Sequence, residues 1–218
     1  MGARAARLSG YNSVVIPLPI DSHLPIITDA LRAHRALVLV AEPGAGKTTR
    51  VPPAIFRSGL LSAQQPNLVM LQPRRIAARA AATRIAEENQ WSVGDEVGYQ
   101  VRFEKRITAR TRIRVVTEAI LTRQLLDDPS LEGVGCVVLD EFHERSIHSD
   151  LAIALLNEVK QSLRDDLMIV VMSATLEAEP VAKFLSDAPI VRVPGRTFPV
   201  DIAYRPRGGA YLEDAVAN

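Results

Sequence analysis

Four runs of aliphatic residues, each followed by a loop and a helical pattern, constrain the fold of this chain more than any other feature. The runs span Ala36–Ala41, Asn67–Leu71, Cys136–Leu139 and Leu167–Met172. They lack hydrophobic alternation, and strands that are apolar on both faces belong to parallel sheets covered by helices on each side. Two weaker runs, Arg112–Val116 and Ile190–Val193, are expected to join them. The sequence therefore predicts an α/β fold with a mostly parallel sheet.

The segments between these strands have helical patterns, and they set the domain boundaries. The expected helices are Ser22–Ala33, Thr48–Ser58, Arg75–Asn89, Glu118–Asp127, Ser149–Leu163 and Ala178–Leu185. One domain is expected over residues 22–193, since single domains run to roughly 100–200 residues. Residues 1–21 open with a small, basic, aperiodic stretch and are expected to be a disordered leader. Residues 194–218 start with repeated Pro and Gly, which indicates an exit linker, and their tail from residue 210 is expected to be the truncated start of a further domain.

Composition excludes several classes of protein. The net charge of +1 excludes binding to nucleic acid by bulk charge alone, so such binding needs local basic patches. The single cysteine, Cys136, can form neither an intrachain disulfide nor a Cys-based zinc cluster, which favours a reducing compartment. No apolar run approaches the roughly 20 residues of a membrane helix. We expect a cytoplasmic protein that does not associate with a membrane.

The first strand is followed by a loop with the chemistry of a phosphate-binding site. Its sequence is Ala41-Glu42-Pro43-Gly44-Ala45-Gly46-Lys47-Thr48-Thr49, and a helix follows. Glycines let backbone N–H groups turn toward phosphates, and the positive N-terminal end of the helix favours the anion. Lys47 is predicted to reach the β- and γ-phosphates of ATP, and Thr48 to supply a hydroxyl to Mg²⁺. The alternative is a Gly-rich turn that only caps a helix.

A pair of acids follows the strand at Cys136–Leu139. Ligands of open α/β sheets bind beyond the carboxyl ends of the strands, so Asp140 is expected on the same rim as Lys47. Asp140 is predicted to hold Mg²⁺, and Glu141 to orient or deprotonate the attacking water. The alternative is that both are ordinary strand-end acids. His143 is a candidate coupling residue, although a lone histidine is more often structural.

The strand that ends at Met172 is followed by Ser173, Ala174 and Thr175. Taken alone, a hydroxyl pair after a strand indicates a turn or a helix N-cap. As the third polar motif at one edge of the predicted sheet, these residues become candidates for coupling.

Read in order, the motifs resemble the superfamily 2 helicases and, within them, the DEAH branch, most closely the bacterial HrpB-like proteins. The resemblance covers residues 24–199. It rests on Ala41–Thr48 with Pro52 downstream (motif I), Gln72–Arg75 (motif Ia), Thr117–Leu121 (motif Ib), Asp140–His143 (motif II) and Ser173–Thr175 (motif III). Phe142 stands where most of the branch has alanine, which is the HrpB-like form.

The resemblance implies a RecA-like P-loop NTPase domain, ATP with Mg²⁺, and single-stranded RNA or DNA as partner. It implies that Pro73, Arg74, Arg75 and Thr117 contact the nucleic acid backbone and that Arg84 stacks on the adenine. The family prior favours RNA. It also implies a second RecA-like lobe, and the 25 residues after Val193 are too few for one. Because an arginine supplied to the γ-phosphate is worth about 10³–10⁵ in rate in related NTPases, this chain alone is expected to bind ATP but hydrolyse it slowly.

Other interpretations stay open at this point. The basic stretch Arg102–Arg114 carries six Lys and Arg residues and fits either a solvated face or a nucleic-acid contact. A second interpretation of the whole chain is a non-catalytic binding module or a regulatory truncation. The chemistry of the site argues against it, because Lys47, Asp140 and Glu141 are all present. A transporter ATPase or a kinase is a third possibility, although neither the transporter signature nor a kinase lid is evident.

Overall fold

The computed structural model describes residues 17–175 and 177–195, which contain one eight-stranded sheet. Its strands in chain order are β1 (Ala36–Ala41), β2 (Asn67–Gln72), β3 (Val97–Val101), β4 (Glu104–Arg106), β5 (Ile113–Thr117), β6 (Val134–Leu139), β7 (Met168–Ser173) and β8 (Ile190–Val193). Their order across the sheet is β4-β3-β5-β2-β6-β7-β1-β8. All neighbours are parallel except β3 and β4, which form an antiparallel hairpin at one edge. The carboxyl ends of the parallel strands therefore share one rim.

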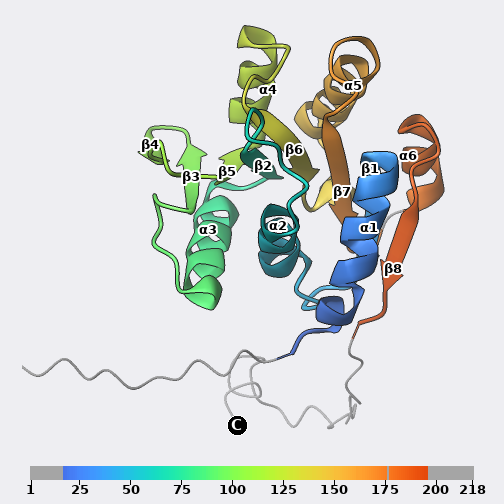
Figure 1. Cartoon of the computed structure of the whole chain (residues 1–218), viewed down its shortest axis with the longest axis horizontal. Helices are drawn as coiled ribbons and strands as arrows, with labels where there is room; N and C mark the ends of the chain where they lie inside the picture. Colours follow the sequence, from blue (N-terminus) through green and yellow to red (C-terminus); the bar gives the residue numbers. More distant parts are fainter. Residues whose placement is uncertain (1–16, 176, 196–218) are drawn as a thin grey trace, which may run out of the picture.

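Helices cover both faces of this sheet, which lies between the two helix layers in Figure 1. The α-helices are α1 (Leu24–His34), α2 (Lys47–Arg57), α3 (Arg75–Asn89), α4 (Glu118–Asp127), α5 (Ile147–Ser162) and α6 (Ala178–Phe184). Two 3₁₀ helices, η1 (Pro19–His23) and η2 (Phe142–Glu144), complete the described elements. None of the described helices is long and apolar enough to cross a membrane.

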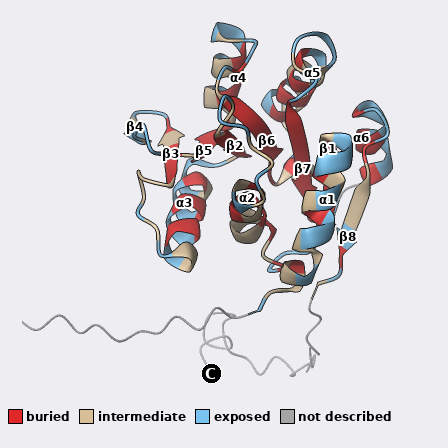
Figure 2. Ribbon diagram, viewed as in Figure 1, coloured by how far each residue is buried: buried red, intermediate tan, exposed pale blue. Residues whose placement is uncertain are grey.

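The core is split by the sheet into two apolar clusters. Alternate residues of each central strand point to opposite faces: in β1, Leu37 and Leu39 pack with α1, α2 and α3, whereas Ala36 and Val38 pack on the side of α4, α5 and α6. The central strands are buried throughout, as Figure 2 shows for β6 and β7. Burial on both faces explains why these strands read as continuous apolar runs.

The predicted α/β architecture is observed, but the sheet has two strands that the sequence did not indicate. β3 contains Gly98 and Gln100, and β4 is a three-residue strand of charged residues. Both lack the apolar run that marked the central strands. The stretch Arg102–Arg114 accordingly holds the β3–β4 turn, β4 and the start of β5, and is not one continuous surface segment.

The first described element, η1, begins at Pro19, before the domain boundary expected at residue 22, and this corrects that boundary. Residues 19–21 belong to η1, and the side chain of Ile20 is fully buried. The Ile20 amide donates to the carbonyl of Ala45 at 3.1 Å, so this segment packs directly under the loop between β1 and α2. The sequence did not indicate this element, because Pro17 and Pro19 are typical of a loop. Residues 1–16 and 196–218, to which most of the leader and the linker were assigned, lie outside the described residues.

Candidate active site

The loop between β1 and α2 has the backbone geometry of a phosphate cradle. Gly44 and Gly46 have φ of 78° and 95°, in the left-handed region that glycine tolerates best. Helix α2 begins at Lys47, so its first N–H groups face the loop. A row of exposed N–H groups at a helix N-terminus favours an anion. The local fold thus matches the expectation for this segment.

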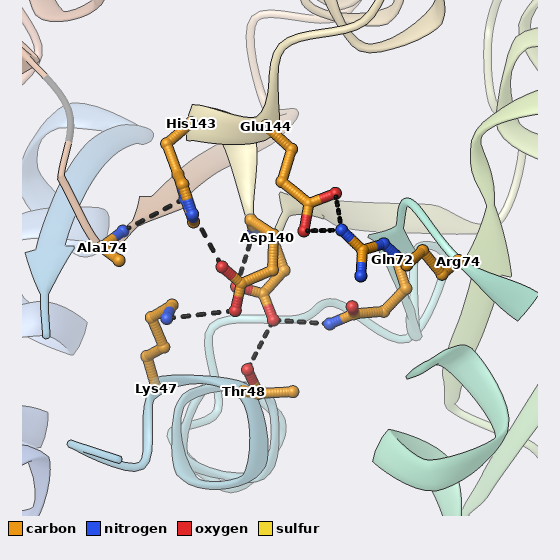
Figure 3. Close-up of polar contacts among 9 residues, drawn as sticks. Lys47, Thr48, Gln72, Arg74, Asp140, His143, Glu144 and Ala174 are labelled. Carbon is orange, nitrogen blue, oxygen red and sulfur yellow. Dashed lines mark hydrogen bonds and ion pairs between the residues drawn. The ribbon is translucent and has the colours of Figure 1, made fainter. Parts of the chain in front are cut away.

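Asp140 lies at the centre of a hydrogen-bond network that joins the ends of β2 and β6 to the start of α2, as Figure 3 shows. One carboxylate oxygen, Oδ2, accepts the hydroxyl of Thr48 at 2.6 Å and the side-chain amide of Gln72 at 2.5 Å. The other oxygen accepts the backbone N–H of Glu141 at 2.9 Å. Asp140 is only 1% exposed. The rim therefore brings Thr48 and Asp140, which are 92 residues apart in sequence, into direct contact.

Burial raises the pKa of Asp140 to about 6, because the charged form loses its hydration. The hydrogen bond from Thr48 and the charge of Lys47 act in the opposite direction, while the charge of Glu141 adds to the rise. A buried carboxylate in this environment is stabilised by a cation placed next to it. The electrostatics of the site thus favour the binding of a positive ion at Asp140.

Glu141 and Lys47 form an ion pair across the same rim, with Nζ 3.1 Å from Oε1. Lys47 is almost fully buried, whereas the Glu141 side chain is partly accessible. Glu141 also has a left-handed backbone, with φ of 54°, a conformation that costs a non-glycine residue about 1–2 kcal/mol. This backbone turns the Glu141 side chain toward the loop that holds Lys47.

His143 sits between the acidic motif and the end of β7. Its Nδ1 accepts the backbone N–H of Ala174 at 3.4 Å and lies 3.5 Å from a carboxylate oxygen of Glu141. An unprotonated Nδ1 accepts from Ala174, whereas only a protonated Nδ1 donates to Glu141, so the two contacts are alternatives. His143 thereby links two of the predicted motifs. Ser173 and Ala174 are buried, and Thr175 is exposed.

Most of the predicted residues of the phosphate loop and the acidic motif line one cavity of about 470 Å³, whereas Ala45 is buried. Its walls are Pro43, Gly44, Gly46, Lys47, Thr48, Thr49, Glu141, His143, Glu144 and Ala174. Asp140 lies beneath them, behind Thr48. Glu42 is exposed beside this cavity, and its backbone carbonyl accepts the Ala45 amide at 3.1 Å. One site thus collects motifs that are widely separated in sequence.

Of the residues predicted to contact nucleic acid, Pro73 and Arg74 line a neighbouring cavity that shares Thr48, Glu141 and Glu144 with this one, while Thr117 is buried. Gln72 and Thr117 are register partners at the ends of β2 and β5, and Pro73 to Arg75 lead into α3. The guanidinium of Arg74 donates to both carboxylate oxygens of Glu144 at 3.1 Å.

Arg84, predicted to stack on adenine, does not line the cavity of the phosphate loop. It lies with Thr48 on a neighbouring cavity of about 410 Å³, and its Nε donates to Glu88 at 2.7 Å.

Three residues of this site had no role in the sequence interpretation. Gln72 and Glu144 contact Asp140 and Arg74, respectively, and both contacts join residues about 70 apart in sequence. Their only sequence signal was their position inside or directly after a predicted motif. Phe142 is 3% exposed and packs in the core on the α5 side of the sheet, which gives the departure from alanine a packing reason.

A protein-family model described as DEAD/DEAH box helicase matches residues 23–184, which is most of the chain and includes all the motifs described above. The chain belongs to the DEAD/DEAH box helicase family. The DEAD/DEAH match also agrees with the motif at Asp140–His143, whose second and fourth residues are Glu and His.

Individual relatives of this family are similar along nearly the whole chain. The chain is 44% identical to the ATP-dependent RNA helicase HrpB of Escherichia coli over 201 residues, which cover 92% of this chain and 24% of that protein. It is 38% identical over 200 residues to an ATP-dependent RNA helicase HrpA homolog of Haemophilus influenzae, covering 89% and 15%. The chain therefore spans about a quarter or less of the length of these relatives.

The structural comparison agrees. The crystal structure of the Escherichia coli DEAH/RHA helicase HrpB matches with a TM-score of 0.79 at 44% identity, over 92% of this chain and 25% of that one. The RecA-like α/β fold predicted from the motifs is confirmed.

Proposed function

We propose that this chain is the ATP-binding motor lobe of a helicase that couples ATP hydrolysis to the remodelling of nucleic acid. The observation that carries the proposal is the convergence of Lys47, Thr48, Asp140 and Glu141 on one rim, through contacts of 2.6–3.1 Å. Phosphoryl transfer needs a phosphate cradle, a metal-binding carboxylate and a group that positions the attacking water. This rim has a residue suited to each task.

The residues present fit Mg²⁺, the ion that we infer accompanies ATP. Mg²⁺ prefers oxygen ligands and is commonly held by one or two protein groups together with substrate phosphates. Asp140 and Thr48 offer a carboxylate and a hydroxyl in direct contact, and burial of Asp140 favours a neighbouring cation. No cluster of three or more acidic, His or Cys side chains that would hold a metal without a nucleotide occurs in the described part of the chain. Bound Mg²⁺ would neutralise charge that develops on the phosphates.

The other residues act on the nucleotide and on water. Lys47 binds the β- and γ-phosphates, for which it must exchange its ion pair with Glu141. Glu141, once released from Lys47, orients the attacking water. His143 exchanges its Nδ1 contact between Ala174 and Glu141 and so couples hydrolysis to the segment that follows β7.

We infer that the nucleic acid partner is single-stranded RNA. Both curated relatives described above carry names that say ATP-dependent RNA helicase. The backbone of this RNA is contacted by Pro73, Arg74, Arg75 and Thr117.

We also infer a cytoplasmic location, which fits a chain whose single cysteine is buried and unpaired.

Taken alone, this chain of 218 residues binds ATP and hydrolyses it slowly. In related NTPases an arginine that reaches the γ-phosphate raises the rate about 10³–10⁵-fold. In this proposal the second lobe of the full-length protein supplies that arginine, and the lobe described here contributes the nucleotide site.

ATP turnover by the purified chain, with and without single-stranded RNA and DNA, tests this proposal. We expect slow turnover that the substitution Glu141→Gln lowers at least tenfold, while nucleotide binding persists. Asp150→Asn, a change on the exposed N-terminal turn of α5, is the matched control and should leave turnover within twofold. Turnover that is equal in Glu141→Gln and wild type would remove Glu141 from the reaction.

A further inference from the structure

Gln72 is a buried amide at the end of β2 whose side chain points at the carboxylate of Asp140. It is 2% exposed, and its Nε2 donates to Oδ2 of Asp140 at 2.5 Å. The same oxygen accepts the hydroxyl of Thr48. Asp140 is thus held by three donors, and Gln72 is the only one that belongs to neither the phosphate loop nor the acidic motif.

The position of Gln72 in the sheet brings about this contact. β2 and β6 are parallel neighbours, with Leu71 in register with Leu139, so the next residues, Gln72 and Asp140, leave the sheet side by side. The Asp140 amide donates to the carbonyl of Leu71 at 3.1 Å, which fixes the two chain ends together. The contact is therefore built into the sheet and does not depend on a loop.

Gln72 also begins the segment that leads into α3. Two residues later, Arg74 donates to both carboxylate oxygens of Glu144, so residues 72 and 74 contact the two ends of the stretch Asp140–Glu144 (Figure 3). Gln72, Arg74, Thr48 and Glu141 line the same cavity. A displacement of residues 72–74 would be transmitted to Asp140 through the Gln72 amide.

We propose that Gln72 is a positioning residue that orients the Asp140 carboxylate for Mg²⁺ bound with ATP. An amide that donates to one carboxylate oxygen fixes the rotation of the carboxylate. With the donors Thr48 and Glu141, it occupies three of the roughly four acceptor sites of Asp140, and the site that is left, on Oδ1, would be available to the cation. Outer partners of metal ligands act in this way, and their loss typically costs about 10–100-fold in metal affinity. This inference rests on the proposed function, since it assumes that Mg-ATP binds at Thr48 and Asp140.

The test compares how much Mg²⁺ strengthens nucleotide binding in three proteins. A non-hydrolysable ATP analogue is titrated calorimetrically into the full chain, once with excess MgCl₂ and once with EDTA, and the ratio of the two Kd values is the readout. Gln72→Met replaces the amide by an apolar side chain of similar length. Asn67→Leu is the matched control, because Asn67 is the buried amide at the other end of β2 and donates to Gly133, far from the loop.

We expect the Mg²⁺ ratio to fall by about tenfold or more in Gln72→Met and to stay within twofold of wild type in Asn67→Leu. Binding in EDTA should change little in either variant. An unchanged ratio in folded Gln72→Met, or an equal loss of binding with and without Mg²⁺, would overturn the role given to Gln72.

A second variant covers the case in which Gln72→Met does not fold. Gln72→Asn keeps a polar amide but withdraws the donor by one methylene, and the ratio should fall in it as well. A wild-type chain that binds the analogue equally well with and without Mg²⁺ contradicts the proposed function itself, and this result differs from a failure confined to Gln72.

Discussion

Individual residues at the rim have properties that are unfavourable for folding but suited to binding a nucleotide. Asp140 is buried, which raises its pKa to about 6, yet it lies where a charged carboxylate is useful. Glu141 has a left-handed backbone that a glycine would adopt at lower cost. Strained and desolvated groups cluster at functional sites because the surrounding structure keeps them in place.

Position 46 favours glycine for two reasons, its backbone conformation and the lack of space for a side chain, and a comparison with Gly44 separates them. Its φ of 95° disfavours any side chain, and a Cβ there would lie 2.6 Å from Cδ1 of Leu18. Gly44 has a similar φ of 78° but open space around it. Gly46→Ala should lower the free energy of unfolding by about 2–4 kcal/mol, against about 1–2 kcal/mol for Gly44→Ala, as measured by urea denaturation. Equal losses in both variants would show that Leu18 does not pack against this loop.

The residue types of the site were predictable from sequence, whereas their partners were not. Lys47, Thr48, Asp140 and Glu141 stand in short patterns that phosphate chemistry requires. Gln72 stands in the stretch Gln72–Arg75 on which the resemblance rests, but nothing in that pattern indicates its contact with Asp140. Its role depends on β2 lying beside β6, and strand order across a sheet is not written in local sequence.

Among the elements, those with an uninterrupted helical or apolar pattern were predicted best. α3 and α4 have the predicted bounds, and β1 matches the run Ala36–Ala41. The β3–β4 hairpin was missed because Gly98 and Gln100 interrupt the apolar pattern of β3, and β4 consists of three charged residues. η1 was missed because Pro19 and the preceding Pro17 suggested a loop, although the buried side chain of Ile20 packs in the core.

Arg164 lies at the end of the sheet opposite the nucleotide rim, where β6 and β7 begin. The guanidinium of Arg164 donates to the carbonyls of Ser130 and Val134 at 2.7 and 3.0 Å and to the carboxylate of Asp166 at 2.6 Å. Its side chain is 12% exposed. It therefore satisfies backbone acceptors where the chain enters β6 and joins that segment to the loop between α5 and β7.

Arg164→Met should lower the free energy of unfolding by about 2–3 kcal/mol, because it leaves these carbonyls without a donor. The comparison is Arg123→Met, whose arginine is 81% exposed and pairs only with Asp127 one helical turn away. That change should cost less than about 0.5 kcal/mol. Thermal and urea unfolding of both variants provide the measurement, and similar stability of the two would contradict a clamp at Arg164.

At the scale of the whole molecule, the sheet acts as a frame that places distant motifs side by side. The phosphate loop follows β1, the acidic motif follows β6, and the segment of residues 73–75 follows β2. The parallel arrangement puts all three on one rim, with β7 between β1 and β6. We infer that a second lobe faces this rim in the full-length protein.

The central claim is that the loop after β1 and the acids after β6 form one ATP site. Equilibrium binding of Mg-ATP to the chain and to Lys47→Ala tests it most directly, with Lys183→Ala on α6 as the control. The account predicts saturable binding with one site per chain, weakened at least tenfold in Lys47→Ala and unchanged in the control. Binding of equal strength in Lys47→Ala and wild type, with both proteins folded, would contradict it.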